Sequence, residues 1–108
     1  MEQSTVALAR FYFTNQIDYK IRPAVIISNE KFNQLHNFVW ACPITTKQTK
    51  KEFELEIPEK EFSGKLEIKS FIRTDTIASM EKEFFLKELG KISKSLFEKL
   101  KTELIKNF

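Results

Sequence analysis

Residues 22–29 read Arg22-Pro23-Ala24-Val25-Ile26-Ile27-Ser28-Asn29, a cation and a proline followed by an apolar run. A second apolar run, Phe38-Val39-Trp40-Ala41-Cys42-Pro43, ends in Ile44-Thr45-Thr46. Short apolar runs bounded by polar segments predict two buried β-strands. An arginine starts one strand and a threonine ends the other. If the two strands pair as neighbours, the guanidinium and the hydroxyl can face one cleft, and this combination suits an anionic phosphate.

The length and composition are those of a single globular domain that spans residues 1–108. Hydrophobic residues make up 42% of the 108 residues and charged residues 31%, which excludes an intrinsically disordered chain. No apolar run reaches membrane-spanning length and the N-terminus lacks a signal-peptide pattern, so we expect a cytoplasmic protein with no membrane partner. The single cysteine, Cys42, lies inside an apolar run, which indicates a buried thiol and no internal disulfide.

Positive charge gathers in the segment that contains both polar candidates. Residues 14–51 contain six basic and two acidic side chains, whereas residues 52–90 contain six basic and ten acidic ones. Focused charge of this kind favours a local phosphate site, although the net charge of the whole chain is only +3. The acidic run at residues 52–61 would repel an anionic ligand, and we expect it to lie away from such a site.

The hydrophobic pattern changes from strands to a helix along the chain. Phe53, Leu55 and Ile57 alternate with glutamates, which predicts a half-exposed strand with its acids in water. Ser93 suits a helix N-cap, and apolar residues then recur every three or four positions as far as Phe108, which predicts an amphipathic helix. Several short strands and one terminal helix together predict a mainly β fold, a small, strongly bent antiparallel barrel with a C-terminal α-helix.

Several segments, in the same order along the chain, resemble the MazF/PemK toxin family of bacterial toxin–antitoxin systems. They are Phe11-Tyr12-Phe13-Thr14, residues 22–29, Cys42-Pro43-Ile44-Thr45-Thr46, Ser70-Phe71-Ile72-Arg73-Thr74-Asp75-Thr76-Ile77 and Leu89-Gly90-Lys91-Ile92-Ser93. The resemblance implies an SH3-like barrel of the CcdB/MazF type that forms a homodimer. It also implies metal-independent, sequence-selective cleavage of single-stranded RNA, and neutralisation by an antitoxin whose C-terminal segment lies across the RNA groove.

The resemblance also assigns roles to individual residues. The family's catalytic arginine corresponds to Arg22 and its catalytic hydroxyl to Thr45, with Thr46 as the alternative if the register shifts by one. The family's RNA-gripping loop corresponds to residues 14–20, and an acidic residue of the family corresponds to Asp75. The residues expected to bind RNA are Thr14, Asn15, Gln16, Asp18, Tyr19, Lys20, Thr46, Lys47 and Asp75.

The types of residue in the chain also limit which cleavage mechanisms are open to it. A single histidine excludes a two-histidine acid–base mechanism, and no His, Cys and Asp set has metal-ligand spacing, so we expect no metal or cofactor. RNA carries its own nucleophile, the 2′-hydroxyl, and the enzyme must orient it and stabilise charge on phosphorus. Because an arginine with a pKa above ~12 is a poor base, Arg22 is expected chiefly to stabilise charge and Thr45 to donate a hydrogen bond. The products would be a 2′,3′-cyclic phosphate and a 5′-hydroxyl.

Other interpretations of the same residues stay open at this point. Arg22 could instead pair with Asp75 or Asp18 at a strand end, and the threonine could be an ordinary β-forming residue. Ser4-Thr5 stands where the family usually has Gly-Asp or Gly-Glu, and the loop at 14–20 lacks the usual glycine. These departures leave a catalytically inactive MazF/CcdB-like barrel, one that binds an antitoxin, nucleic acid or another protein, as an alternative. A plain SH3-like peptide-binding module fits less well, because most aromatic residues lie inside apolar runs.

Overall fold

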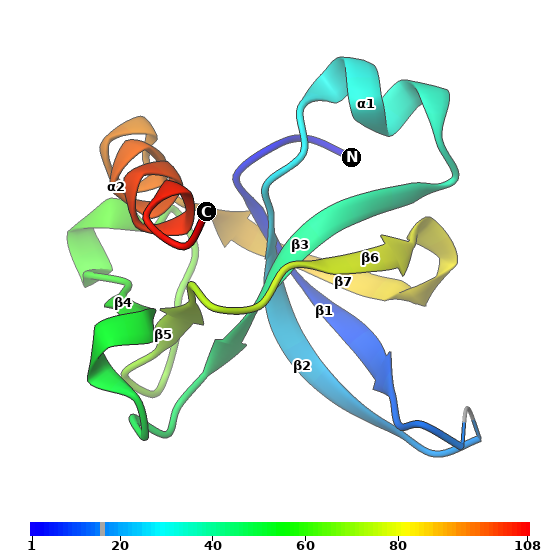
Figure 1. Cartoon of the computed structure of the whole chain (residues 1–108), viewed down its shortest axis with the longest axis horizontal. Coiled ribbons are helices and arrows are strands. Elements are labelled where there is room, and N and C mark those ends of the chain that lie inside the picture. Colours follow the sequence, from blue (N-terminus) through cyan, green and yellow to red (C-terminus); the bar gives the residue numbers. More distant parts are fainter. Residues whose placement is uncertain (16) are drawn as a thin grey trace.

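Seven β-strands and two α-helices make up the computed structural model, which describes residues 1–15 and 17–108 (Figure 1). Short 3-10 turns cover residues 51–53, 59–61 and 82–84. The helices are α1 (Glu30–Leu35) and α2 (Lys94–Ile105). The strands are β1 (Thr5–Tyr12), β2 (Tyr19–Ile26), β3 (Phe38–Thr45), β4 (Glu54–Glu56), β5 (Phe71–Arg73), β6 (Ala78–Glu81) and β7 (Phe85–Lys91).

The strands pair antiparallel in the order β4-β5-β3-β2-β1-β7, and β6 pairs with β3. The two apolar runs of the sequence are neighbours, with Val25 opposite Cys42. Strand β3 pairs with β2 and β6 along most of its length and with β5 at its end, so it passes from one part of the curved sheet into the other (Figure 1). Among the described residues the pairings form an open, curved path. The predicted mainly β fold with a C-terminal helix is confirmed.

Two apolar clusters lie on opposite faces of the β1–β2–β3 sheet. Adjacent strand residues such as Ala24 and Val25 point to opposite faces, so each apolar run contributes to both clusters. The larger cluster is covered by α2, and the smaller one is closed by Met80 together with Phe85. The larger cluster includes Val6, Val25, Cys42, Ile44 and Ile72, and the smaller one includes Ala9, Ala24, Ala41 and Met80.

Helix α2 begins where the sequence predicts. The hydroxyl oxygen of Ser93 accepts a hydrogen bond of 3.0 Å from the backbone N–H of Leu96, which is N-cap geometry. Leu96, Leu100 and Leu104 recur at four-residue spacing and are buried against the larger cluster. Burial of a leucine side chain contributes on the order of 1.5–3 kcal/mol, so packing holds this helix in place. Phe108, at the end of the apolar stripe, stays exposed.

The only two glycines of the chain lie against each other. A Cβ atom on Gly64 would lie 2.0 Å from the carbonyl oxygen of Leu89, and one on Gly90 would lie 2.6 Å from the backbone nitrogen of Gly64. Gly90 also has a φ of +155°, which side-chain-bearing residues rarely adopt. Glycine at both positions therefore allows the backbone of β7 to approach the backbone at Gly64 closely.

Two local features differ from the sequence prediction. Strand β2 begins at Tyr19 and not at Arg22, and Pro23 lies where β2 pairs with β1 but not yet with β3. The missing N–H of a proline is tolerated at such an edge. The acidic alternation forms only the three-residue strand β4, and Glu54 is 9% exposed because β4 packs beside β5. The expectation that all acids of this strand stand in water is therefore wrong for Glu54.

Candidate active site

Arg22 lies on β2 just beyond the point where β3 separates from it. The register pairs Ala24 with Pro43, and two more residues of the same register would set Arg22 opposite Thr45. Opposite residues of an antiparallel pair point to the same face, so the guanidinium and the hydroxyl belong to one side of the sheet. Arg22 is exposed, and none of the ion pairs among the described residues involves it. The backbone of Arg22 is therefore fixed in β2, and its side chain is exposed to solvent.

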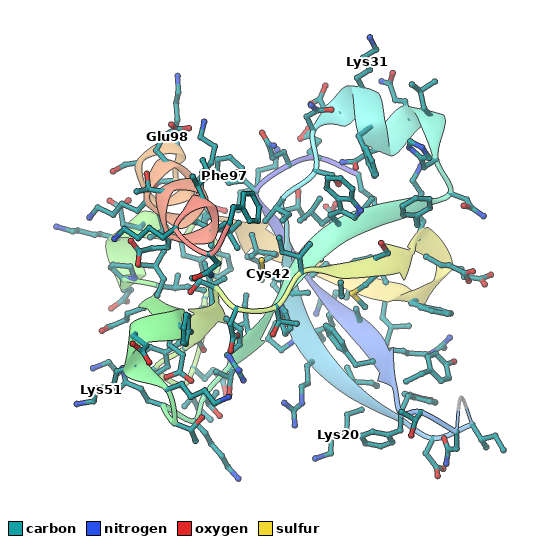
Figure 2. The ribbon with its side chains drawn as sticks, viewed as in Figure 1. Lys20, Lys31, Cys42, Lys51, Phe97 and Glu98 are labelled. Atoms are coloured by element: carbon teal, nitrogen blue, oxygen red, sulfur yellow. The ribbon has the colours of Figure 1, made fainter. Side chains whose placement is uncertain are left out.

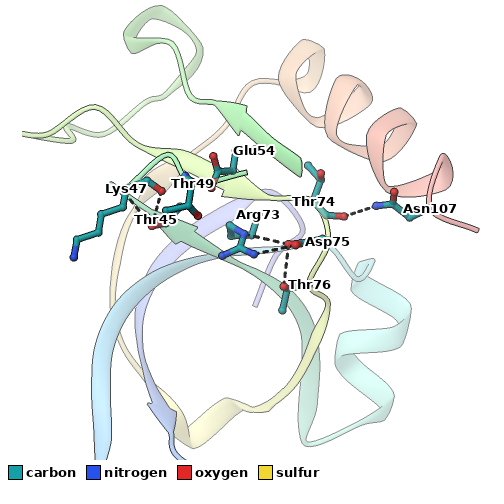
Figure 3. Close-up of polar contacts among 9 residues, drawn as sticks. All are labelled: Thr45, Lys47, Thr49, Glu54, Arg73, Thr74, Asp75, Thr76 and Asn107. Atoms are coloured by element: carbon teal, nitrogen blue, oxygen red, sulfur yellow. Dashed lines mark hydrogen bonds and ion pairs between the residues drawn. The ribbon is translucent and has the colours of Figure 1, made fainter. Parts of the chain in front are cut away.

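Thr45 is the last residue of β3 and is half-buried. Its Oγ1 accepts a hydrogen bond of 3.1 Å from the backbone N–H of Lys47, which fixes the oxygen in a tight turn (Figure 3). The hydroxyl can donate to the carbonyl oxygen of Lys47 only at 3.4 Å, which is a weak contact. The proton of Thr45 is therefore available to a stronger acceptor. The neighbouring Thr46 is exposed and follows the end of the strand.

Arg73 and Asp75 form a bidentate ion pair (Figure 3). Arg73 donates from Nε to one carboxylate oxygen at 3.1 Å and from one terminal nitrogen to the other at 2.9 Å. The hydrogen bonds from Arg73 lower the pKa of Asp75, and those same bonds raise the pKa of Arg73. The carboxylate of Asp75 is thus engaged by Arg73 and by the hydroxyl of Thr76, which disfavours its pairing with Arg22.

Sequence reasoning missed Arg73. The β3–β5 register pairs Ile44 with Ile72, so Arg73 lies opposite Pro43 and on the face of Thr45. The signal was present in Arg73-Thr74-Asp75, because residues two apart at a strand end can point the same way. Only the pairing of β3 with β5 shows that this face is the one that carries the threonine.

Glu54 is the acidic residue nearest to this pair in the sheet. It lies opposite Arg73 across β4 and β5, and its Oε2 accepts a hydrogen bond of 3.3 Å from the backbone N–H of Thr49. Its Oε1 is buried and has no hydrogen-bond partner among residues 1–15 and 17–108. The charge of Glu54 adds to that of Asp75 in raising the pKa of Arg73. Arg73 is therefore bound to Asp75 and lies opposite Glu54, whereas Arg22 is an arginine of this face without an ion-pair partner among the described residues.

The β1–β2 loop is closed by side-chain hydrogen bonds in place of a glycine. Oδ1 of Asn15 accepts from the backbone N–H groups of Ile17 and Asp18 at 3.0 and 3.2 Å, and its amide donates to the carboxylate of Asp18 at 3.1 Å. In such an Asx turn the Asn side chain stabilises the reversal of the chain, so no glycine is needed. Asn15 and Asp18 are thereby occupied in holding the loop, while Thr14 is exposed. Gln16 lies outside the described residues.

Tyr19 and Lys20 do not share a face. They are successive residues of β2, so their side chains point to opposite sides of the β1–β2 hairpin. Lys20 belongs to the side of Arg22, and Tyr19 belongs to the side of Arg10 and Tyr12. Both are exposed, and so is Lys47 after β3. The predicted RNA contacts Lys20 and Lys47 can therefore lie near Arg22 and Thr45, whereas Tyr19 faces away from them.

Cys42 is a packing residue of the larger cluster (Figure 2). It is fully buried, and burial raises the pKa of its thiol to about 12, with a smaller contribution from the charge of Asp75. Within the part of the chain that the structure describes, no three His, Cys, Asp or Glu residues gather to hold a metal ion. None of the described helices is long and apolar enough to cross a membrane.

Solved structures of toxins share this fold. A MazE–MazF complex from Deinococcus radiodurans has a TM-score of 0.81 at 16% identity and covers 99% of this chain and 94% of that one. An endoribonuclease from a mycobacterial species, solved in complex with its cognate antitoxin, has a TM-score of 0.79 at 20% identity and covers 98% and 92%. The Mycobacterium tuberculosis toxin MazF-mt6 has a TM-score of 0.72 at 20% identity and covers 95% and 93%. At these identities the structures establish the fold alone.

The family is established by the sequence as a whole. Among curated proteins none matches this chain. A family model described as the PemK-like, MazF-like toxin of type II toxin–antitoxin systems matches residues 2–108. The resemblance noted in five separate segments thus extends over nearly the whole chain. The chain belongs to the PemK-like, MazF-like toxin family of type II toxin–antitoxin systems.

Proposed function

We propose that this protein is a metal-independent endoribonuclease that cuts single-stranded RNA at selected sequences and acts as the toxin of a type II pair. The observation that carries the proposal is the placement of Arg22 and Thr45. An exposed guanidinium without an ion-pair partner among the described residues lies on the same face as a hydroxyl whose oxygen is fixed and whose proton is available. Two such donors of fixed position match the needs of a phosphate that gains negative charge.

In the proposed reaction the 2′-oxygen attacks the neighbouring phosphorus and the bond from phosphorus to the 5′-oxygen breaks. The 2′-hydroxyl releases its proton to a solvent water and the leaving 5′-oxygen takes one up, which yields a 2′,3′-cyclic phosphate and a 5′-hydroxyl. Arg22 would chiefly stabilise the extra charge on the non-bridging oxygens, and in a second role it would donate the proton to the leaving oxygen and regain one from solvent, while Thr45 donates a hydrogen bond. Asp75 holds Arg73 in position, because both of its oxygens already accept hydrogen bonds.

The proposed RNA path follows basic side chains that make no ion pair among the described residues. Lys20 on β2 and Lys47 after β3 flank the two catalytic residues, and the backbone of an RNA strand would pass between the β1–β2 hairpin and the turn at residues 45–47. Thr14 and Thr46 are further proposed contacts along this path, and Asp75 would border it through its ion pair with Arg73. A single strand is required because the attacking oxygen must reach an in-line position, which a stacked A-form duplex opposes.

The decisive experiment is cleavage in the absence of metal. Purified protein is expected to cut a long single-stranded RNA in the presence of EDTA, because the proposed stabilisation of charge comes from side chains alone. End mapping should show a cyclic phosphate and a 5′-hydroxyl at each cut, and a matched duplex should resist. A requirement for added Mg²⁺, or cleavage that leaves a 5′-phosphate, would contradict the mechanism. Binding of RNA with no cleavage under any condition would favour the inactive barrel.

The proposal includes an antitoxin partner. Relatives of this fold from a mycobacterial species and from Deinococcus radiodurans were solved with their antitoxins. The open face that carries Arg22 and Lys20 is where a segment with acidic side chains would compete with RNA for the same cation.

The proposal also includes a homodimer, formed through the groove between α2 and β3. The groove has a volume of about 690 Å³ and is lined by Trp40, Phe97, Ile105 and Phe108. Trp40 is 43% exposed and Phe108 is 89% exposed. Large apolar side chains gathered on one surface mark an interaction site, and a second copy would bury the same set on both subunits.

A charge placed in this groove is expected to separate the subunits. Trp40→Arg should shift the protein from dimer to monomer in sedimentation velocity, because it removes a large apolar contact and buries an added charge on both sides of the twofold interface. Ile68→Arg is the matched control, since Ile68 is 65% exposed and does not line this groove. Equal behaviour of the two variants would exclude the groove as the interface.

A further inference from the structure

The face of the β1–β2 hairpin opposite to Arg22 carries two exposed tyrosine rings, which pack with the half-buried ring of Phe84. Tyr12 and Tyr19 are directly opposite each other, with ring centres 5.2 Å apart, and the rings of Tyr12 and Phe84 are 5.0 Å apart. Tyr12 is 38% exposed and Tyr19 is 44% exposed. We call Tyr12, Tyr19 and Phe84 the hairpin platform. The site chemistry described above does not use it.

A guanidinium and a hollow adjoin the hairpin platform. The central carbon of the Arg10 guanidinium lies 5.5 Å from the centre of the Tyr19 ring, within cation–π range. A hollow of about 680 Å³ is lined by Tyr12, Phe13, Thr14 and Phe84. Phe13 is itself 47% exposed. Flat ring faces, a cation and a hydroxyl at the rim form a surface that can hold a planar polar ring.

We infer that the hairpin platform is a stacking site for an unpaired nucleobase of the RNA substrate; this inference rests on the proposed function. Residues 19 to 23 of β2 pair only with β1, so the other edge of β2 is free over this stretch. Tyr19 and Arg22 lie three residues apart on it, about 10 Å along a strand. An RNA backbone held at Lys20 and Arg22 on one face can therefore turn a base from a nearby nucleotide round the free edge onto the ring of Tyr19.

The charges around the hairpin platform favour a base over a phosphate there. Glu83 directly precedes Phe84 in the chain, so one carboxylate is joined to the edge of the platform, where it would oppose a phosphate. Phosphates are expected to stay with Lys20 and Arg22. A base has no charge to repel, and it gains stacking on the rings and a cation–π contact with Arg10.

The test uses a strand that cannot be cut. The probe is a mixed-sequence, fully 2′-O-methylated single-stranded oligonucleotide, and fluorescence anisotropy measures its affinity for the full-length protein. Tyr19→Leu should weaken binding by roughly 5- to 150-fold, the range found when one stacked base loses its aromatic partner. Tyr19→Phe should bind like the parent protein because it keeps the ring. Ile21→Ala is the matched control, since Ile21 is 52% exposed on the same face but offers no ring.

A probe of the same length without bases separates stacking from phosphate contacts. The parent protein should bind this abasic probe more weakly, and Tyr19→Leu should cause no further loss. Full affinity of Tyr19→Leu and Tyr12→Leu for the base-containing probe would overturn the inference and assign the face to a protein partner. Equal losses for Tyr19→Phe and Tyr19→Leu would overturn it as well. Base-dependent binding without cleavage of ordinary RNA would support the stacking site and refute the proposed reaction, whereas cleavage with unaltered affinity in the leucine variants would do the reverse.

Discussion

Replacement of Arg22 by alanine is expected to slow RNA cleavage by ~100- to 1000-fold, the range found when one donor to a developing negative charge is removed. Arg22 is the arginine on the Thr45 face that makes no ion pair among the described residues, whereas Arg73 is bound by Asp75 and lies opposite Glu54. The rate should be measured under single-turnover conditions in EDTA, so that binding and product release do not limit it. Exposed substitutions of this kind usually change stability by less than about 0.5 kcal/mol, so the fold should survive.

Arg22→Lys is the informative companion variant. Lysine keeps the charge but loses the planar fork that can contact two phosphate oxygens, so its rate should fall between those of the parent protein and the alanine variant. Thermal unfolding of all three proteins provides the control for folding. If Arg22→Ala cut RNA at the parental rate while the fold was intact, Arg22 would have no catalytic role. If Arg73→Ala alone abolished cleavage, the essential cation would be Arg73, despite its ion pair with Asp75.

Replacement of Thr45 by valine is expected to slow cleavage by ~100-fold or more, since valine keeps the branched shape but lacks the hydroxyl donor. Serine at the same position should retain most of the rate. The substitution also removes the acceptor for the backbone N–H of Lys47, which costs about 1 kcal/mol as a lost hydrogen bond. Thermal unfolding should detect this loss, and the serine variant should not show it.

Thr46→Val serves as the control for the position of the catalytic hydroxyl. Thr46 is the next residue along, exposed, and lies beyond the last residue of β3. Its loss should leave the rate within a few-fold of the parent value. If instead Thr46→Val were inactive and Thr45→Val active, the hydroxyl would belong to the neighbouring residue and the face described here would be the wrong one.

Much of the fold could be predicted because its signals are local. The apolar runs that became β2 and β3, the N-cap at Ser93 and the leucine stripe of α2 each depend on spacing within a few residues. A shared face for the arginine and the threonine required that β2 and β3 pair, and the structure shows this pairing. The start of β2 was placed too late, because the polar residues Tyr19 and Lys20 extend a strand that has solvent on one side.

The candidate site could be predicted only in part, because its members come from strands that meet by packing. Arg22 and Thr45 were assigned from the apolar runs that flank them and from the family resemblance. Arg73 was not, since its place beside Thr45 depends on the bend of β3 from β2 to β5. Glu54 was expected in water, and it is buried because β4 is only three residues long and lies against β5.

The sequence by itself determined that the two apolar runs form strands, where the last helix begins, and that an arginine and a threonine flank those runs. These signals could be predicted because periodicity and capping act between near neighbours. The tertiary structure alone decided which polar groups share a face. It joined Arg73 to Asp75, turned Tyr19 away from Lys20's side toward Tyr12 and Phe84, and left Arg22 without a carboxylate among the described residues. The physical reason is that strand register and sheet curvature arise from burial of residues far apart in the chain, and a shift of one residue exchanges the two faces of a strand.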